Sequence, residues 1–230
     1  MSKNGKFAPN LAEFDTNFDI IGAMINIIFF IALVLVIPIS ALLPIWFGWE
    51  NGPLESAQNV LLLAGFVICL CYQKGAKGRS KKESQMWLSV GLFYLFMLAR
   101  ELSWGRVFFL DYIDANGPGF VRLQTLDAYP YIYAGIGFFA LLMLYMLIRT
   151  IPWRELWREI PFNRLTVYIL ILAAAISQMA EHDFPYETHN LNQTVEEGAE
   201  LLVYVIMLYL TREYYLHLKA KFERENSNQI

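Results

Sequence analysis

Acidic and histidine side chains gather in residues 177–204, between two long apolar runs. The carboxylates belong to Glu181, Asp183, Glu187, Glu196, Glu197 and Glu200, and the imidazoles to His182 and His189. Carboxylates mixed with imidazoles are ligands for Zn²⁺, Mn²⁺ or Fe²⁺, whereas carboxylates alone suit Ca²⁺ or Mg²⁺. Without a metal, the same groups can relay protons or cations. Because an unpaired charge at membrane depth costs at least a few kcal/mol, this stretch is the first candidate for a site.

The chain around this stretch has the composition of a membrane protein. Of its 230 residues, 57% are hydrophobic and 17% are charged, and the mean hydropathy is +0.38. A soluble domain carries roughly a quarter charged residues, and a transmembrane barrel would show alternating segments of about 10 residues. We therefore expect an all-α fold, a polytopic transmembrane helical bundle. The net charge of −3 also argues against a nucleic-acid partner, which would require a basic surface.

Six apolar segments approach or exceed the length of about 20 residues that a membrane span needs. We place the spans at residues 20–47, 53–72, 86–110, 131–148, 165–181 and 196–215. The third is apolar to Ala99 and continues through a more polar stretch to residue 110. The sequence thus divides into a polar arm (1–18), a six-helix transmembrane domain (19–216) and a charged tail (217–230).

Lysine and arginine set the orientation of these spans. Most of them lie in the loops 73–85 and 149–164 and in the tail, which six spans would place on one side together with the N-terminus. By the positive-inside rule that side is cytoplasmic. Both termini are then cytoplasmic, and the loops 48–53, 111–130 and 183–195 face outward.

This topology brings the acids that are embedded in the spans to the outer face. Glu55 opens the second span, Arg100 and Glu101 lie late in the third, Glu181 and His182 end the fifth, and Glu196, Glu197 and Glu200 open the sixth. Polar residues at helical spacing form one stripe on each of three spans, as Glu55, Gln58 and Asn59 do. Polar stripes in apolar helices should face each other or a water-filled cavity.

Some of these residues also have a purely structural interpretation. Thr194 followed by Glu197 has the spacing of a capping box at the start of the sixth span. Glu55 and Glu196 would suit the first turn of a helix, where the helix dipole favours acids. Glu101 could form an ion pair, for which Arg100 and Arg106 are the nearest candidates in sequence. Arg100 itself would more readily serve a neighbouring helix, because adjacent residues diverge by about 100°.

These observations favour an outward-facing pocket that binds a cation. We expect a divalent metal (Zn, Mn, Fe or Ca) with the ligands Glu101, Glu181, His182, Glu200, Glu55 and Glu197. In an enzyme, this site would carry out metal-assisted hydrolysis or transfer on membrane lipid, with Glu101 and Glu200 as the catalytic carboxylates. The sequence lacks HExxH, GxSxG, P-loop and GxGxxG motifs, so the reaction stays open. The alternatives are a cation or proton transport component, and a non-catalytic subunit that binds a second copy or a partner membrane protein.

Residues 99–106 read A-R-E-L-S-W-G-R and resemble the E-x-S-W-G pattern of small bacterial inner-membrane proteins. Those proteins also carry an acid that opens an early span and a late E-x-H-N-like run, to which Glu55 and residues 187–190 correspond. The resemblance implies a multi-pass protein of the bacterial cytoplasmic (inner) membrane and no particular activity. A fainter similarity is to the alkaline ceramidase and adiponectin-receptor superfamily of seven-helix zinc amide hydrolases. Their histidine pair, four residues apart, has no counterpart in this chain.

Overall fold

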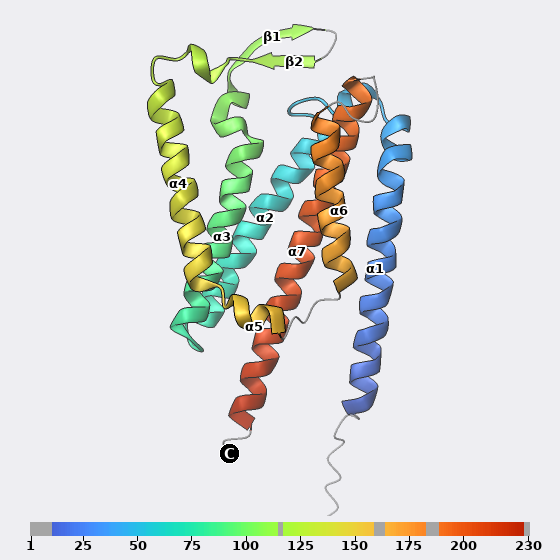
Figure 1. Cartoon of the computed structure of the whole chain (residues 1–230), viewed down its shortest axis with the longest axis vertical. Coiled ribbons are helices and arrows are strands. Elements are labelled where there is room, and N and C mark those ends of the chain that lie inside the picture. The colour runs from blue at the N-terminus through green and yellow to red at the C-terminus, as the bar shows by residue number, and fades with distance from the viewer. Residues whose placement is uncertain (1–10, 115–116, 159–163, 183–188, 228–230) are drawn as a thin grey trace, which may run out of the picture.

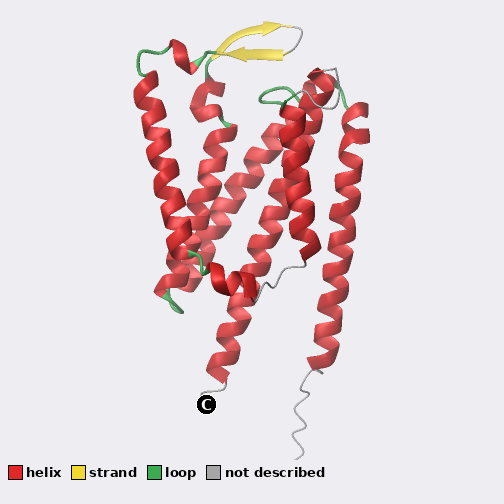
Figure 2. Ribbon diagram, viewed as in Figure 1, coloured by secondary structure: helices red, strands yellow, loops and turns green. Residues whose placement is uncertain are grey.

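A computed structural model of the chain describes residues 11–114, 117–158, 164–182 and 189–227, and this part is almost entirely helical (Figures 1 and 2). Its helices are α1 (Leu11–Leu42), α2 (Pro53–Ala76), α3 (Lys81–Glu101), α4 (Tyr129–Thr150), α5 (Trp153–Arg158), α6 (Arg164–Glu181) and α7 (His189–Ser227). Short 3-10 helices are η1 (Ile45–Phe47), η2 (Ser103–Phe108) and η3 (Leu123–Thr125). Strands β1 (Leu110–Asp114) and β2 (Gly117–Phe120) form a small antiparallel hairpin. The all-α expectation is confirmed, with this hairpin added.

Four helices of the described part are long and apolar enough to cross a membrane. They are residues Ile21–Leu42 of α1, then α2, α4 and α6. Large apolar side chains such as Ile28 and Leu141 are exposed on them, at 60% and 68%, as expected for helices that face hydrocarbon. The expectation of a membrane protein is therefore supported. The other two long helices, α3 and α7, are more polar, and their crossing of the membrane stays a prediction.

Helix α7 lies between two groups of helices and holds them together (Figure 1). One face packs with α1 and α6 through a cluster that includes Phe29, Ile169, Ala173 and Ile206. Another face packs with α2 and α3 through Leu62, Trp87, Tyr94 and Tyr204. The α2–α3 pair is especially close, because a Cβ atom at Gly65 would lie 2.5 Å from the Tyr94 ring. Glycine at this position lets the two helices approach.

The third predicted span ends earlier than expected. Helix α3 stops at Glu101, and the chain turns through Ser103, Trp104 and Gly105, whose φ angles are 45°, 57° and 90°. The left-handed conformation costs a non-glycine residue roughly 1–2 kcal/mol, and a right-handed helix cannot pass through it. The prediction of a helical span to residue 110 is therefore wrong. Residues 103–114 instead form η2 and β1.

The first predicted span also ends earlier, and the last begins earlier. Helix α1 stops at Leu42, shortly before Pro44, so the predicted end at residue 47 is wrong. Helix α7 starts at His189, which places Thr194 inside the helix, where its hydroxyl donates to the carbonyl of Asn190 at 3.0 Å. The capping-box prediction is wrong for this reason. Tertiary burial stabilises the extra turns, since Asn192, Thr194 and Val195 are 1–2% exposed.

Candidate functional site

Seven glutamates line one cavity of about 400 Å³ at the end of the bundle that carries the β hairpin. They are Glu50, Glu55, Glu101, Glu181, Glu196, Glu197 and Glu200. The other described residues of the lining are Arg100, Ser103 and Arg106. We call this cavity the glutamate pocket. The turn before α2, the start of α2, the ends of α3 and α6, η2 and the first turns of α7 together build it.

Arg100 joins the acids of two helices. Its Nη2 lies 2.7 Å from the Oε1 atoms of both Glu101 and Glu200, and its Nε lies 3.1 Å from Glu101. The hydroxyl of Tyr204 also donates to Glu101, at 2.6 Å, and that of Ser177 donates to Glu200, at 3.2 Å. Arg100 therefore pairs with its sequence neighbour and with the neighbouring helix at once. One guanidinium and two hydroxyls hold two carboxylates of the pocket in place.

Glu197 and Glu55 are held by weaker partners. The side-chain amide of Gln58 donates to both the carboxylate and the backbone carbonyl of Glu197, at 2.8 Å each. The backbone N–H of Asn51 donates to Oε2 of Glu55 at 2.5 Å. Glu55 is only 4% exposed, and within the described residues its buried Oε1 atom has no hydrogen-bond partner. A buried carboxylate oxygen without a donor is costly, so the pocket contains an unmet demand for positive charge or a donor.

The turn before α2 is tied to the turn after α3. Glu50 forms an ion pair with Arg106, and the hydroxyl of Ser103 donates to Glu50 at 3.3 Å. The side-chain amide of Asn51 donates to the carbonyl of Val107 at 3.3 Å. These bonds fix the left-handed Ser103–Gly105 turn against the start of α2. The E-x-S-W-G stretch therefore builds one wall of the pocket.

The pocket contains five of the six predicted ligands. Glu55, Glu101, Glu181, Glu197 and Glu200 all line it, whereas His182 is exposed and lies outside its lining. On α6, Ser177 is buried but Gln178 and Glu181 are exposed, so the expected polar stripe faces inward only in part. Asp183, Glu187 and the side chain of His189 lie outside the described residues.

Sequence reasoning missed Glu50 and gave Arg106 no more than a possible pairing. Glu50 follows an apolar span in a short Gly- and Pro-containing turn, where an acid is ordinary. Only its pairing with Arg106, 56 positions later, brings it to the cavity. The one available signal was the pair of arginines, Arg100 and Arg106, on either side of the S-W-G turn.

The described residues offer no ready-made metal centre. No three of their His, Cys, Asp or Glu side chains come together in a way that could hold a metal ion. The carboxylates instead surround an open cavity, and Arg100, Arg106 and Gln58 already occupy oxygens of four of them. The side-chain atoms of the described lining that could ligate a cation are oxygens of glutamate and serine, since no histidine belongs to it. Oxygen ligands of this kind suit hard cations such as Ca²⁺ and Mg²⁺.

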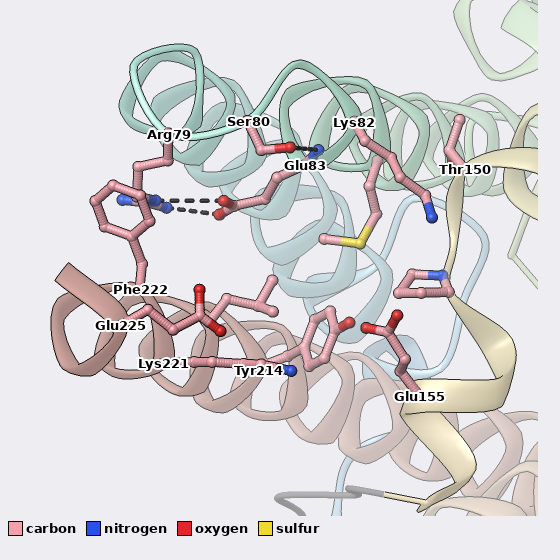
Figure 3. Close-up of a pocket in the computed structure, with 13 residues that line it drawn as sticks. Arg79, Ser80, Lys82, Glu83, Thr150, Glu155, Tyr214, Lys221, Phe222 and Glu225 are labelled. Atoms are coloured by element: carbon pink, nitrogen blue, oxygen red, sulfur yellow. Dashed lines mark hydrogen bonds and ion pairs between the residues drawn. The ribbon is translucent and has the colours of Figure 1, made fainter. Parts of the chain in front are cut away.

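A second cavity, of about 250 Å³, lies at the opposite end of α2, α3 and α7 (Figure 3). Its charged lining residues are Arg79, Lys82, Lys221, Glu83, Glu155 and Glu225. We call it the tail pocket, because the last turns of α7 form one side. Arg79 forms two hydrogen bonds with Glu83, at 2.6 and 3.3 Å, and the Ser80 hydroxyl caps the start of α3.

Comparison with known proteins found no match, so the functional argument rests on the geometry of the pockets. No protein-family model, no curated protein and no solved structure matches the chain. The resemblance of residues 99–106 to the E-x-S-W-G pattern therefore stays a prediction.

Proposed function

We propose that this chain is a six-span protein of the bacterial cytoplasmic membrane whose glutamate pocket binds a cation at the outer face. Helices α1, α2, α3, α4, α6 and α7 would form the spans. The basic segments near residues 73–85 and 149–164 and the end of α7 then lie in the cytoplasm. The glutamate pocket, at the other end of the bundle, opens outward at the depth of the lipid head groups.

The observation that carries this proposal is the excess of carboxyl groups over guanidinium groups around the pocket. Seven carboxylates face two guanidinium groups around one cavity, and the buried Oε1 of Glu55 lacks a donor among the described residues. Like charges repel strongly where water is partly excluded. A bound cation would relieve this repulsion and satisfy Glu55. The carboxylate oxygens, with no imidazole in the described lining, favour a hard divalent ion such as Ca²⁺, or an ammonium group, over Zn²⁺.

The proposed roles of Glu101 and Glu200 follow from their partners. Both carboxylates pair with Arg100, so they would contribute negative charge to the pocket and would not act as a free base. Glu55 and Glu196 would make direct contact with the cation. Metal-assisted lipid hydrolysis would then need a base among these less constrained glutamates.

Transport has less support than binding. Beyond the pocket, the apolar and aromatic side chains of Leu62, Tyr94 and Ile206 are buried at 0–1% exposure between the helices. A cation path through the bundle would have to cross them. A role as a partner subunit is favoured by one observation, since Phe108 and Phe109 next to the hairpin and Ile113 in strand β1 are 65–72% exposed. Such an apolar surface fits either the membrane interface or another membrane protein.

Titration of the purified, detergent-solubilised protein with Ca²⁺, Mn²⁺, Zn²⁺ and ethanolamine would test the proposal by calorimetry. We expect Ca²⁺ or ethanolamine to bind and to raise the unfolding temperature. Glu55→Gln should weaken binding about tenfold, as the loss of one charged contact does. Glu155→Gln, in the tail pocket, is the matched control and should bind as the wild type does. Wild-type protein that is folded but binds none of the four ligands would overturn the proposal.

A further inference from the structure

A third cavity, of about 220 Å³, adjoins the glutamate pocket and has the opposite chemical character. It is lined by Arg100, Ser103, Trp104, Arg106, Leu123, Gln124 and Tyr133, so its described lining contains no carboxylate. Arg100, Ser103 and Arg106 also line the glutamate pocket. We call this cavity the arginine pocket. An acidic space and a space rich in hydrogen-bond donors therefore share the two arginines, which we call the arginine wall.

Both arginines keep donors after their ion pairs are made. Arg106 uses Nη2 for Glu50 and Ser103, while its Nε is buried and lacks a partner among the described residues. Arg100 uses Nε and Nη2 for its bonds to Glu101, Glu200 and Tyr204, and no bond of its Nη1 occurs in the described part of the chain. A guanidinium presents five N–H donors in a planar fork that matches phosphate and carboxylate oxygens. An oxyanion in the arginine pocket would therefore lie beside two guanidinium groups that keep unused donors.

The left-handed turn after α3 brings these arginines together. In a continuous helix, Arg106 would follow Arg100 by six steps of about 100° and point to a different face. The positive φ angles of Ser103, Trp104 and Gly105 end the helix and return Arg106 to the same cavity. Non-glycine residues rarely adopt this conformation, and strained residues of this kind cluster at functional sites.

We propose that the arginine pocket binds the phosphate of a ligand whose ammonium group lies in the glutamate pocket. The combined site would then take an aminoalkyl phosphate, the chemistry of a phosphoethanolamine head group. This inference rests on the proposed cation binding and adds the class of ligand. The same chemistry occurs in a free metabolite and in a membrane lipid.

The charges on both sides of the arginine wall favour a zwitterion over a simple ion. A lone oxyanion would bind close to seven carboxylates, and a lone cation would bind close to two guanidinium groups. Each is opposed by like charge, whereas a ligand with both groups meets the opposite charge on each side. Trp104 and Tyr133 also line the arginine pocket, and these residue types are enriched at the head-group level of membranes.

The first experiment compares one zwitterion with its two halves. Purified full-length protein in maltoside detergent would be titrated with phosphoethanolamine, inorganic phosphate and ethanolamine by calorimetry. We expect phosphoethanolamine to bind about tenfold or more tightly than either half, because both subsites contribute. A second arm would measure, by native mass spectrometry, the retention of phosphatidylethanolamine and of phosphatidylglycerol. Preferential retention of phosphatidylethanolamine without binding of the free head group would identify a membrane lipid as the source.

Variants of the arginine wall separate the two subsites. Arg106→Gln should weaken phosphoethanolamine binding about tenfold, whereas ethanolamine should bind at least as tightly as before, because the change removes a positive charge from the glutamate pocket. Arg106→Lys keeps a charge for Glu50 but loses the planar fork, so it should fold and still bind phosphoethanolamine more weakly than the wild type. Arg122→Gln is the matched control, because Arg122 is an exposed arginine on the same side of the molecule and outside the pocket. It should change nothing.

Three results would overturn the inference or separate it from the cation proposal. Wild-type binding of phosphoethanolamine by both folded Arg106 variants would overturn it. Failure of the free head group and of phosphatidylethanolamine to bind would do the same. If ethanolamine and Ca²⁺ do not bind, but phosphate binds and is lost in Arg106→Gln, the cation proposal fails and the oxyanion subsite remains.

Discussion

The glutamate pocket and the tail pocket lie at opposite ends of the same helices and differ in whether their acidic and basic side chains balance. The tail pocket has three basic and three acidic side chains in its lining, and its Arg79 and Glu83 satisfy each other (Figure 3). Trp87 donates to the same carboxylate at 3.3 Å, and Arg79 lies 5.4 Å from the ring centroid of Tyr215. The hydrogen bond to Glu83 raises the pKa of Arg79, which keeps the pair ionised.

The glutamate pocket gathers charge without balancing it. Within the described residues, its carboxyl groups outnumber its guanidinium groups by seven to two, and Oε1 of Glu55 and Nε of Arg106 are buried without a hydrogen-bond partner. A cluster of charged side chains therefore does not by itself indicate a ligand-binding site. Charges that pair within the tail pocket stabilise the fold, whereas unmatched charge and unpaired buried atoms indicate a missing ligand.

The largest expected effect comes from removing the counter-charge of the glutamate pocket. Arg100→Met should lower the free energy of unfolding by about 2–3 kcal/mol, because Glu101 and Glu200 stay partly buried without their partner. The value is below that for a fully buried pair, since the Arg100 side chain is 47% exposed. Denaturant unfolding in detergent would measure it. Arg212→Met removes a more exposed pair with Glu213 and should cost less than about 1 kcal/mol; equal losses would contradict the comparison.

An intermediate effect distinguishes a hydrogen bond to a carboxylate from a hydrogen bond between two neutral hydroxyls in the same buried cluster. Tyr204→Phe removes the 2.6 Å bond to Glu101 and should cost about 2 kcal/mol. Tyr94→Phe removes a 2.9 Å contact with the Thr211 hydroxyl and should cost about 1 kcal/mol. Both tyrosines are 1–2% exposed, so burial is matched. A larger loss of stability in Tyr94→Phe than in Tyr204→Phe would contradict the prediction that the hydrogen bond to the Glu101 carboxylate is the stronger one.

The smallest expected effect has the opposite sign. Glu196→Gln removes one negative charge from the glutamate pocket and should stabilise the cation-free protein by about 0.5–1 kcal/mol, while weakening cation binding. Glu225→Gln removes one negative charge from the balanced tail pocket and should change the free energy of unfolding by less than about 0.5 kcal/mol. Unfolding temperatures with and without Ca²⁺ would show both. Destabilisation of the cation-free protein by Glu196→Gln would mean that the pocket is not over-charged.

The fold class was predictable because the apolar runs are long and the charges are segregated. Those features indicate helices in a membrane without any knowledge of packing. The ends of the helices were less predictable, as α3 and α7 show. The break at Ser103 and Trp104 depends on non-glycine residues held in a left-handed conformation, and the early start of α7 depends on burial of Asn192 and Thr194. Local helix propensity predicts neither the break after α3 nor the early start of α7.

The candidate site was predictable to the extent that each acid belongs to a span. Glu55, Glu101, Glu197 and Glu200 could be assigned to one layer from topology alone, and the structure brings them to one cavity. Glu50 could not, because its place depends on Arg106 from a distant turn. His182 could not be excluded, because the last turn of α6 decides which way its side chain points.

The sequence by itself determined that this is a helical membrane protein with its acids concentrated in the terminal turns of several helices. Hydropathy and residue order carry that information, since each span is stable as a local unit in lipid. Only the tertiary structure decided that seven glutamates share one cavity, that Arg100 bridges two of them and that a second, donor-rich cavity adjoins it. The physical reason is that side-chain neighbours between helices follow from helix order and rotation, which are set by packing such as that of Gly65 against Tyr94.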